Sequence, residues 1–197
     1  MIKKYNNKYR ITSARLPQWD YGNSATYFVT ICTKNRESYF GNIDQGVMQL
    51  SPLGDIALKF WLEMPAHFPF LTLDAFVIMP NHVHGIIVID KIHAPTIGSM
   101  HPVETPNLVE TPKLGVSTAS NTDAASQKWK PATLGVVINQ YKRIVTIHAR
   151  KIEAGYAWQS RFHDHIIRNY ESYLKIRNYI LYNPMNWTND SLNQITE

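Results

Sequence analysis

Two extended, strongly apolar segments separated by only two residues constrain the fold of this chain more than any other feature. The first segment covers residues 71–79 and the second covers residues 82–90, with Pro80-Asn81 between them. Strands joined by so short a connection are typical of a tight antiparallel hairpin. Residues 25–33 are dense in β-branched and aromatic side chains and predict a further strand. We therefore expect an antiparallel sheet at the centre of the protein.

Helical patterns alternate with these strands. Ser51-Pro52 predicts the start of an amphipathic helix that runs to about Met64, because serine caps helices and proline suits the first helical position. Apolar residues at helical spacing predict a second helix from Thr133, and Asn169 begins a last helix that ends at Asn183 before a proline. The remaining predicted elements are turns at Gly41-Asn42 and Gln45-Gly46, a short strand over 47–50 and a last strand over 162–168. This order predicts an α+β fold of the ferredoxin-like type, with helices packed on one face of an antiparallel sheet.

Composition limits the class of protein. A chain of 197 residues has room for one sizeable core, so we expect a single domain, 1–197. Within it, residues 1–24 read as a basic arm and residues 91–130 as a flexible Pro/Thr/Ser-rich insertion. No apolar run approaches the about 18 residues of a membrane span, and no signal peptide is evident, so a cytoplasmic protein is expected.

Charge and cysteine content narrow the candidate chemistry. The formal net charge of +5 fits a polyanionic partner without requiring one. A single cysteine, Cys32, excludes an internal disulfide and a cysteine-based zinc site.

The sharpest chemical signal is the sequence His82-Val83-His84 within the second strand of the hairpin. Strand side chains alternate between faces, so both imidazoles project from one face while Val83 points into the opposite layer. Two imidazoles on one face make half of a metal site. The alternative is that they are two polar residues on the solvated face of a half-buried strand.

A second signal lies at the end of the last helix. Tyr179 and Asn183 are four residues apart and therefore share a helix face. A phenol and an amide oxygen can then face the same cavity. The alternatives are a tyrosine whose ring packs in the core and an asparagine that merely ends the helix.

Basic residues form a weaker pattern. Lys142 and Arg143 lie beside Tyr141 in the second helix, and further basic side chains crowd the last strand. Positive grooves with aromatic platforms hold single-stranded nucleic acid. An ordinary solvated helix face explains the same residues equally well.

In combination, these blocks resemble the HUH endonucleases, and more closely the REP-associated tyrosine transposases. The matching segments are 13–16, 19–21, 27–33, 76–84, 158–168 and 176–180, and the insertion at 91–130 matches least. The resemblance implies an HUH-type fold with a C-terminal helix that carries a nucleophilic tyrosine. It also implies a partner, single-stranded DNA beside small imperfect hairpins.

The resemblance further implies a role for each matching residue. His82 and His84 would bind Mg²⁺ or Mn²⁺, Asn183 stands where relatives place a third ligand, and Tyr179 would be the nucleophile. The expected product is a 5′-phosphotyrosine that can be rejoined to another DNA end. The candidate DNA contacts are Arg10, Arg15, Trp19, Lys142, Arg143, Trp158, Arg161, His165 and Arg168.

Three alternatives remain open on the sequence alone. The chain could be a metal-dependent hydrolase that uses a metal-bound water, or a catalytically silent regulator that binds hairpin DNA or RNA. The third alternative is that Tyr182 replaces Tyr179 as the nucleophile. Both a monomer and a homodimer are compatible with the sequence.

Overall fold

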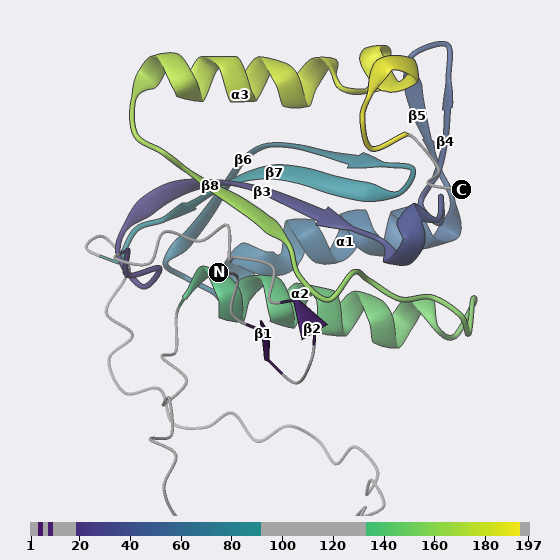
Figure 1. Ribbon diagram of the computed structural model, residues 1–197, viewed down its shortest axis with the longest axis horizontal. Coiled ribbons are helices and arrows are strands. Elements are labelled where there is room, and N and C mark those ends of the chain that lie inside the picture. The colour runs from purple at the N-terminus through teal and green to yellow at the C-terminus, as the bar shows by residue number, and fades with distance from the viewer. Residues whose placement is uncertain (1–3, 6–7, 10–18, 92–132, 194–197) are drawn as a thin grey trace, which may run out of the picture.

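A four-stranded antiparallel sheet forms the centre of the protein (Figure 1). The computed structural model describes residues 4–5, 8–9, 19–91 and 133–193. The strands are β3 (Ala25–Cys32), β6 (Leu71–Met79), β7 (His82–Ile89) and β8 (His163–Ile167), in the order β6-β7-β3-β8. Met79 pairs with His82 across the Pro80-Asn81 turn, which confirms the predicted hairpin. With one helix between β3 and β6 and another between β7 and β8, this order is ferredoxin-like, as expected.

The helices lie on both faces of the sheet. Figure 1 shows α1 (Pro52–His67) and α2 (Leu134–Ala149) together beneath the sheet and α3 (Tyr170–Tyr182) above it. The expected packing on one face therefore holds for α1 and α2, whereas the C-terminal helix covers the opposite face. No helix in the described ranges has the length and apolarity needed to cross a membrane.

Side-chain caps begin the helices where the sequence predicts them. Ser51 Oγ accepts a hydrogen bond from the Gly54 N–H (3.1 Å), and Asn169 Oδ1 accepts one from the Ser172 N–H (2.8 Å). The first helix extends past Met64, its expected end, to His67. It can do so because Pro65 lies in the last turn, where a missing N–H removes a single hydrogen bond.

The smaller elements correct one expectation. They are β1 (Lys4–Tyr5), β2 (Lys8–Tyr9), β4 (Gly41–Asp44), β5 (Val47–Leu50), and two 3₁₀ helices, η1 (Lys34–Arg36) and η2 (Pro184–Asn189). Gly41-Asn42, predicted as a turn, instead begins β4. The turn lies at Gln45-Gly46, where both residues have positive φ (46° and 77°).

Two predicted segments fall largely outside the described residues. Of the insertion at 91–130, the structure describes only Lys91. Of the basic arm at 1–24, it describes β1, β2 and residues 19–24. Trp19 packs against the core and its Nε1 donates to the Tyr27 hydroxyl (3.1 Å), so the packed domain begins within the segment predicted as an arm.

The main core lies between the sheet and the α1/α2 layer. The alternating residues Tyr27, Val29 and Ile31 of β3 and Val83 of β7 are buried there. Because side chains alternate along a strand, the neighbours of these residues face α3. The fold thus buries one face of the sheet in the main core, and the other face lies under α3.

Gly85 is expected to be essential for packing in this core. A Cβ atom at Gly85 would lie 2.3 Å from a ring carbon of Trp61, which is fully buried. Gly85→Ala should therefore lower the free energy of unfolding by about 1–3 kcal/mol, the usual cost of overpacking. Urea denaturation measures this, with Gly155→Ala as the control, since a Cβ there approaches only the end of the Glu153 side chain. Equal stability of the two variants would contradict the prediction.

Candidate active site

His82 and His84 face α3 side by side on β7. Their ring centroids are 4.3 Å apart, and Val83 between them is buried in the core on the opposite face. Both imidazoles are almost completely buried, at 0% and 2% exposed. The reading of these residues as polar side chains on a solvated strand face is therefore wrong.

Hydrogen bonds around Asn81 fix the tautomer of His82. The Asn81 Nδ2 group donates to the carbonyls of Arg36 (3.1 Å) and Leu192 (2.8 Å), which identifies Oδ1 as the amide's acceptor. His82 Nδ1 lies 2.7 Å from that oxygen and must be the N–H donor. The lone pair of His82 is consequently on Nε2, a buried atom that has no hydrogen-bond partner in the described part of the chain.

His84 links the sheet to the tyrosine of α3. Its Nδ1 lies 2.9 Å from Thr30 Oγ1, on the neighbouring strand β3. Its Nε2 lies 3.2 Å from the Tyr179 hydroxyl. The hydroxyl can donate to this nitrogen, so the strand histidine and the helical tyrosine meet at one point.

Burial keeps both imidazoles neutral. It lowers the pKa of His82 well below its ordinary value, with further lowering from the neighbouring His84. Burial likewise lowers the pKa of His84, to about 4, although the nearby Asp190 opposes the shift. Neutral imidazoles offer their lone pairs, as metal ligation requires.

These shifts predict that acid destabilises the protein. Between pH 6.5 and pH 4 the unfolded His84 binds a proton that the folded residue does not, so the free energy of unfolding falls as pH falls. From His84 alone the loss is about 3 kcal/mol. Urea denaturation across this range measures it. His84→Gln should flatten the pH dependence, and the exposed-site control His67→Gln should not. An equally steep dependence in His84→Gln would contradict the assignment.

Tyr179 lies with its hydroxyl directed into the site and part of its ring exposed. Its ring contacts the rings of His84 and Phe28, and the side chain is 46% exposed. Partial burial raises the pKa of the Tyr179 hydroxyl, and the charge of Asp190 raises it further, while a hydrogen bond with Asn183 opposes both. The hydroxyl is therefore protonated at neutral pH. Tyr182, in contrast, is 55% exposed and makes no hydrogen bond to either histidine.

Asn183 and Asp190 complete the cluster. Asn183 ends α3 and is buried, and its Nδ2 group donates to Asp190 Oδ2 (2.9 Å). Its Oδ1 atom is buried without a partner among the described residues. Single ligand atoms of His82, His84 and Asp190 all lie within 4.8 Å of one another. The structure thus brings Tyr179, Asn183 and the two histidines together, as predicted, and adds a carboxylate.

The sequence reasoning missed Asp190. One signal could have found it, because Asp190 is the only acidic residue within 172–196. It is held by the chain that follows η2. Arg36 Nη1 donates to the Ser191 carbonyl (2.8 Å), and the Leu192 N–H donates to Asp190 Oδ1 (2.7 Å).

The other end of α3 is attached by a carboxylate on β6. The Tyr173 hydroxyl donates to Asp74 Oδ2 (2.6 Å), and Arg177 Nε lies 3.8 Å from Asp74 Oδ1. Ile180 is the only α3 side chain that is fully buried. Because apolar packing of this helix is slight, polar contacts at both of its ends hold Tyr179 over the histidines.

The structure describes most, but not all, of the candidate DNA contacts. Arg10 and Arg15 are outside the described residues. Trp158 packs among the rings of Phe40, Tyr141 and Tyr156, which is a core contact and not an open stacking surface. The exposed candidates are Arg143, Arg161, His165 and Arg168.

Lys142 has a structural contact of its own. Its Nζ donates to the Gln159 carbonyl (2.5 Å), and burial lowers the pKa of its ammonium. For Trp19 and Trp158, whose indoles are used in packing, the structure offers no support for a stacking role. For the remaining residues, contact with DNA stays a prediction.

The donor set of the cluster fits a divalent cation. His82 Nε2 and Asn183 Oδ1 are buried polar atoms without partners among the described residues, and such atoms cost free energy unless a ligand satisfies them. Two neutral imidazoles with a carboxylate and an amide oxygen suit a borderline first-row ion such as Mn²⁺ at least as well as Mg²⁺.

Comparison with known proteins gives a relative in sequence and a solved structure of similar fold. No family model matches the chain. An uncharacterized protein of Haemophilus influenzae is 36% identical over 195 residues, which are 98% of each chain. A solved structure of a REP-associated tyrosine transposase bound to a REP hairpin has a TM-score of 0.53 and 19% identity, over 89% of this chain and 74% of that one.

Proposed function

We propose that this chain, which belongs to one family with the Haemophilus influenzae protein and has the fold of a REP-associated tyrosine transposase, is a single-strand DNA endonuclease and strand transferase. It would cleave next to hairpin sequences through a covalent 5′-phosphotyrosine. Tyr179 is the nucleophile, and His82, His84, Asn183 and Asp190 are the residues that would hold a divalent cation.

One observation carries the proposal. The Tyr179 hydroxyl lies 3.2 Å from His84 Nε2, in a cluster where His82, Asn183 and Asp190 present further ligand atoms. The contact joins residues 95 positions apart in the sequence. A tyrosine placed for packing alone has no need of a buried, neutral histidine pair at its hydroxyl.

The proposed reaction uses this geometry. The Tyr179 oxygen attacks the scissile phosphorus, the bond between phosphorus and the 3′ oxygen breaks, and the strand leaves with a 3′-hydroxyl. A divalent cation held by these residues would supply positive charge against the phosphate oxygens. Attack on the phosphotyrosine by a second 3′-hydroxyl reverses the chemistry and joins two DNA ends.

The chain's own groups control the tyrosine proton. In the arrangement seen here, His84 Nε2 is the nearest acceptor for the hydroxyl. Asn183 and Asp190 also interact with it, Asn183 by a hydrogen bond that favours the ionised form. If His84 Nε2 binds the cation instead, Asn183 and Asp190 remain to hold the Tyr179 hydroxyl in place.

Two other functions are less well supported. A hydrolase that activates water gives no reason for a tyrosine hydroxyl in contact with a candidate ligand. A catalytically silent regulator would have no use for the four candidate ligands that converge beside that hydroxyl. Loss of catalysis would be expected to change the catalytic residues, yet the paired histidines and the tyrosine are all in place.

Incubation with labelled hairpin DNA tests the proposal. The hairpin should carry a single-stranded flank, and Mn²⁺ should be present. We expect a protein–DNA adduct that survives denaturing electrophoresis and disappears when a chelator removes the metal. Cleavage without any adduct would instead support the hydrolase, and binding without cleavage would support the silent regulator.

A further inference from the structure

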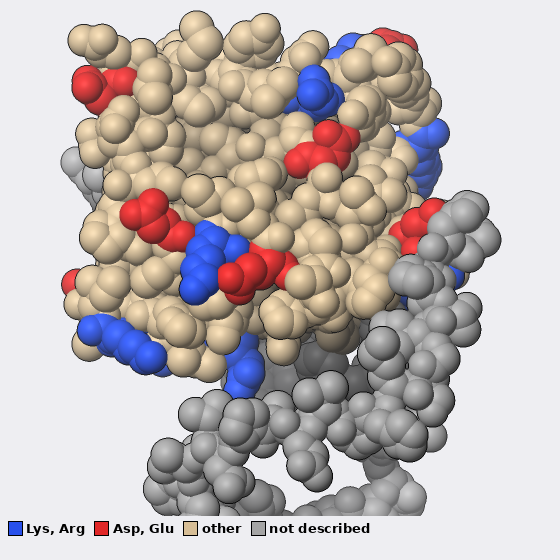
Figure 2. All heavy atoms as spheres, turned by 180° about the vertical axis from the view of Figure 1, so that it is seen from behind, with Lys and Arg blue, Asp and Glu red and all other residues tan. Residues whose placement is uncertain are grey.

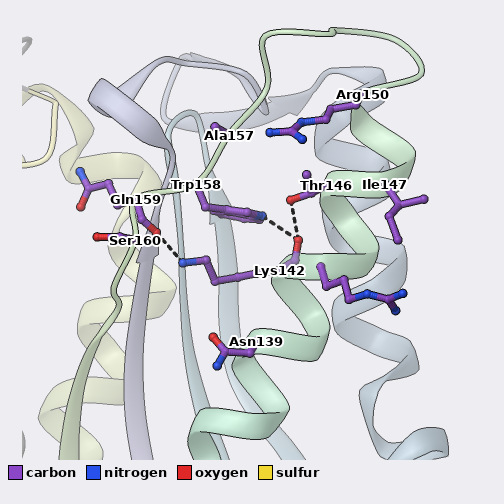
Figure 3. Close-up of a pocket in the computed structure, with 10 residues that line it drawn as sticks. Asn139, Lys142, Thr146, Ile147, Arg150, Ala157, Trp158, Gln159 and Ser160 are labelled. Atoms are coloured by element: carbon purple, nitrogen blue, oxygen red, sulfur yellow. Dashed lines mark hydrogen bonds between the residues drawn. The ribbon is translucent and has the colours of Figure 1, made fainter. Parts of the chain in front are cut away.

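A groove on the far side of the sheet from the histidines has no part in the chemistry above. It lies between α2 and the chain that leads into β8, and its volume is about 440 Å³ (Figure 3). The residues that line it along α2 are Asn139, Lys142, Arg143, Thr146, Ile147 and Arg150. These positions form one stripe along the helix, so the groove is about 16 Å long.

The described residues that line this groove are basic or neutral and include no acid. Residues 157–160 form the wall opposite α2. The charged residues of the lining are Lys142, Arg143 and Arg150, on the α2 side. The Lys142 ammonium is held by loop carbonyls, and Arg150 Nε donates to the Tyr156 carbonyl (3.0 Å). Arg143 is exposed and makes no ion pair or hydrogen bond with the described residues.

The surface shown in Figure 2 differs from the groove in its charge. In the middle of Figure 2, a basic patch has acidic side chains on either side of it, so the charges largely cancel. In the groove, amides and hydroxyls from Asn139, Gln159 and Ser160 accompany the cations instead. Cations joined by neutral donors are the surroundings that phosphate oxygens require.

The groove is connected to the active-site face along the edge of the sheet. β8 is an edge strand, and the chain that forms one wall of the groove leads directly into it. Arg161, His163 and His165 are exposed along this path. In the pairing with β3, His163 lies opposite Thr30, the residue that contacts His84.

We propose that the groove along α2 is a second DNA contact, which binds backbone phosphates of the same strand on the face of the sheet opposite the histidines. This inference rests on the proposed function. The strand would pass from the active site around the β8 edge into the groove.

The groove is expected to bind without regard to base sequence. Among the described residues of its lining, the one aromatic side chain is Trp158, which already packs among three other rings and donates its Nε1 to the Lys142 carbonyl (3.1 Å). Bases therefore have no stacking platform here, and the contact is one of charge.

Binding measurements on Arg143 variants test the proposal. Fluorescence anisotropy would follow two hairpin oligonucleotides that share a single-stranded flank length and differ in sequence. Arg143→Ala should weaken binding of both several-fold and reduce the slope of log affinity against log salt by about 0.7 to 0.9. Arg143→Glu should weaken it further. The control is Lys59→Ala, an equal charge change at an exposed position on α1.

Two outcomes would overturn the proposal. One is a salt slope for Arg143→Ala equal to that of Lys59→Ala, and the other is a loss confined to one of the two sequences. Adduct yield at saturating DNA is measured as well, and the control Lys59→Ala should match the wild type there. If the wild type formed no adduct, the proposed function would fail while the binding comparison still tested the groove.

Discussion

Tyr179→Phe should abolish the covalent protein–DNA adduct and lower the rate of strand cleavage by about 10⁴-fold or more. The substitution removes the hydroxyl oxygen that forms the bond to phosphorus and leaves the ring in contact with His84 and Phe28. Folding and hairpin binding should persist, because the ring is half exposed and the core lies on the other face of the sheet. Single-turnover cleavage assays measure the effect.

Tyr182→Phe is the matched control for this experiment. Tyr182 is on the same helix and is similarly exposed, but neither a hydrogen bond nor a ring contact joins it to His82 or His84. Its hydroxyl should be dispensable for the adduct. If cleavage survived in Tyr179→Phe and disappeared in Tyr182→Phe, the nucleophile would have been wrongly assigned.

Loss of either histidine should remove the metal site. His82→Gln and His84→Gln are each expected to weaken Mn²⁺ binding by more than about 100-fold, since even residues behind the ligands contribute about 10- to 100-fold. Asp190→Asn should weaken it by about tenfold, because it keeps an oxygen donor but removes the negative charge. Isothermal titration of the DNA-free protein with Mn²⁺ gives these affinities independently of cleavage.

The matched control for the metal experiment is His67→Gln, at an exposed position at the end of α1. It should bind Mn²⁺ like the wild type. Near-ultraviolet circular dichroism would show whether each variant keeps its packed aromatic core. A folded His84→Gln variant with undiminished Mn²⁺ affinity would rule out the proposed ligand set.

Local sequence patterns were sufficient to predict which side chains share a face within each element of the site. The period of two along a strand places His82 and His84 on one face and Val83 in the core, and the i, i+4 spacing in a helix aligns Tyr179 with Asn183. Neither pattern says that α3 crosses the sheet above β7. That proximity is tertiary, and before the structure only the family resemblance indicated it.

Asp190 shows what such patterns do not contain. It follows a proline and a 3₁₀ turn, and its place is set by contacts that Arg36 and Asn81 make with the two residues after it. These partners come from a turn and a hairpin far away in the sequence. No periodicity connects them, so sequence could single out Asp190 as an isolated acid near the C-terminus, but its position at the histidine pair comes from the folded chain.

Aromatic residues were the least predictable. Composition cannot separate an indole that stacks on a base from one that packs in a core, and both Trp19 and Trp158 pack. The fold itself was easier, because the cap at Ser51 and the short Pro80-Asn81 connection act locally. Even so, the helix after Ser51 runs past Met64, since a proline near a helix end costs little.

Anomalous diffraction from crystals grown with Mn²⁺ tests the central claim most directly. The account predicts one strong manganese peak within bonding distance of Nε2 of both His82 and His84, on the side that faces the Tyr179 hydroxyl. A map without density between those two nitrogens, or with manganese bound only elsewhere on the chain, would contradict it.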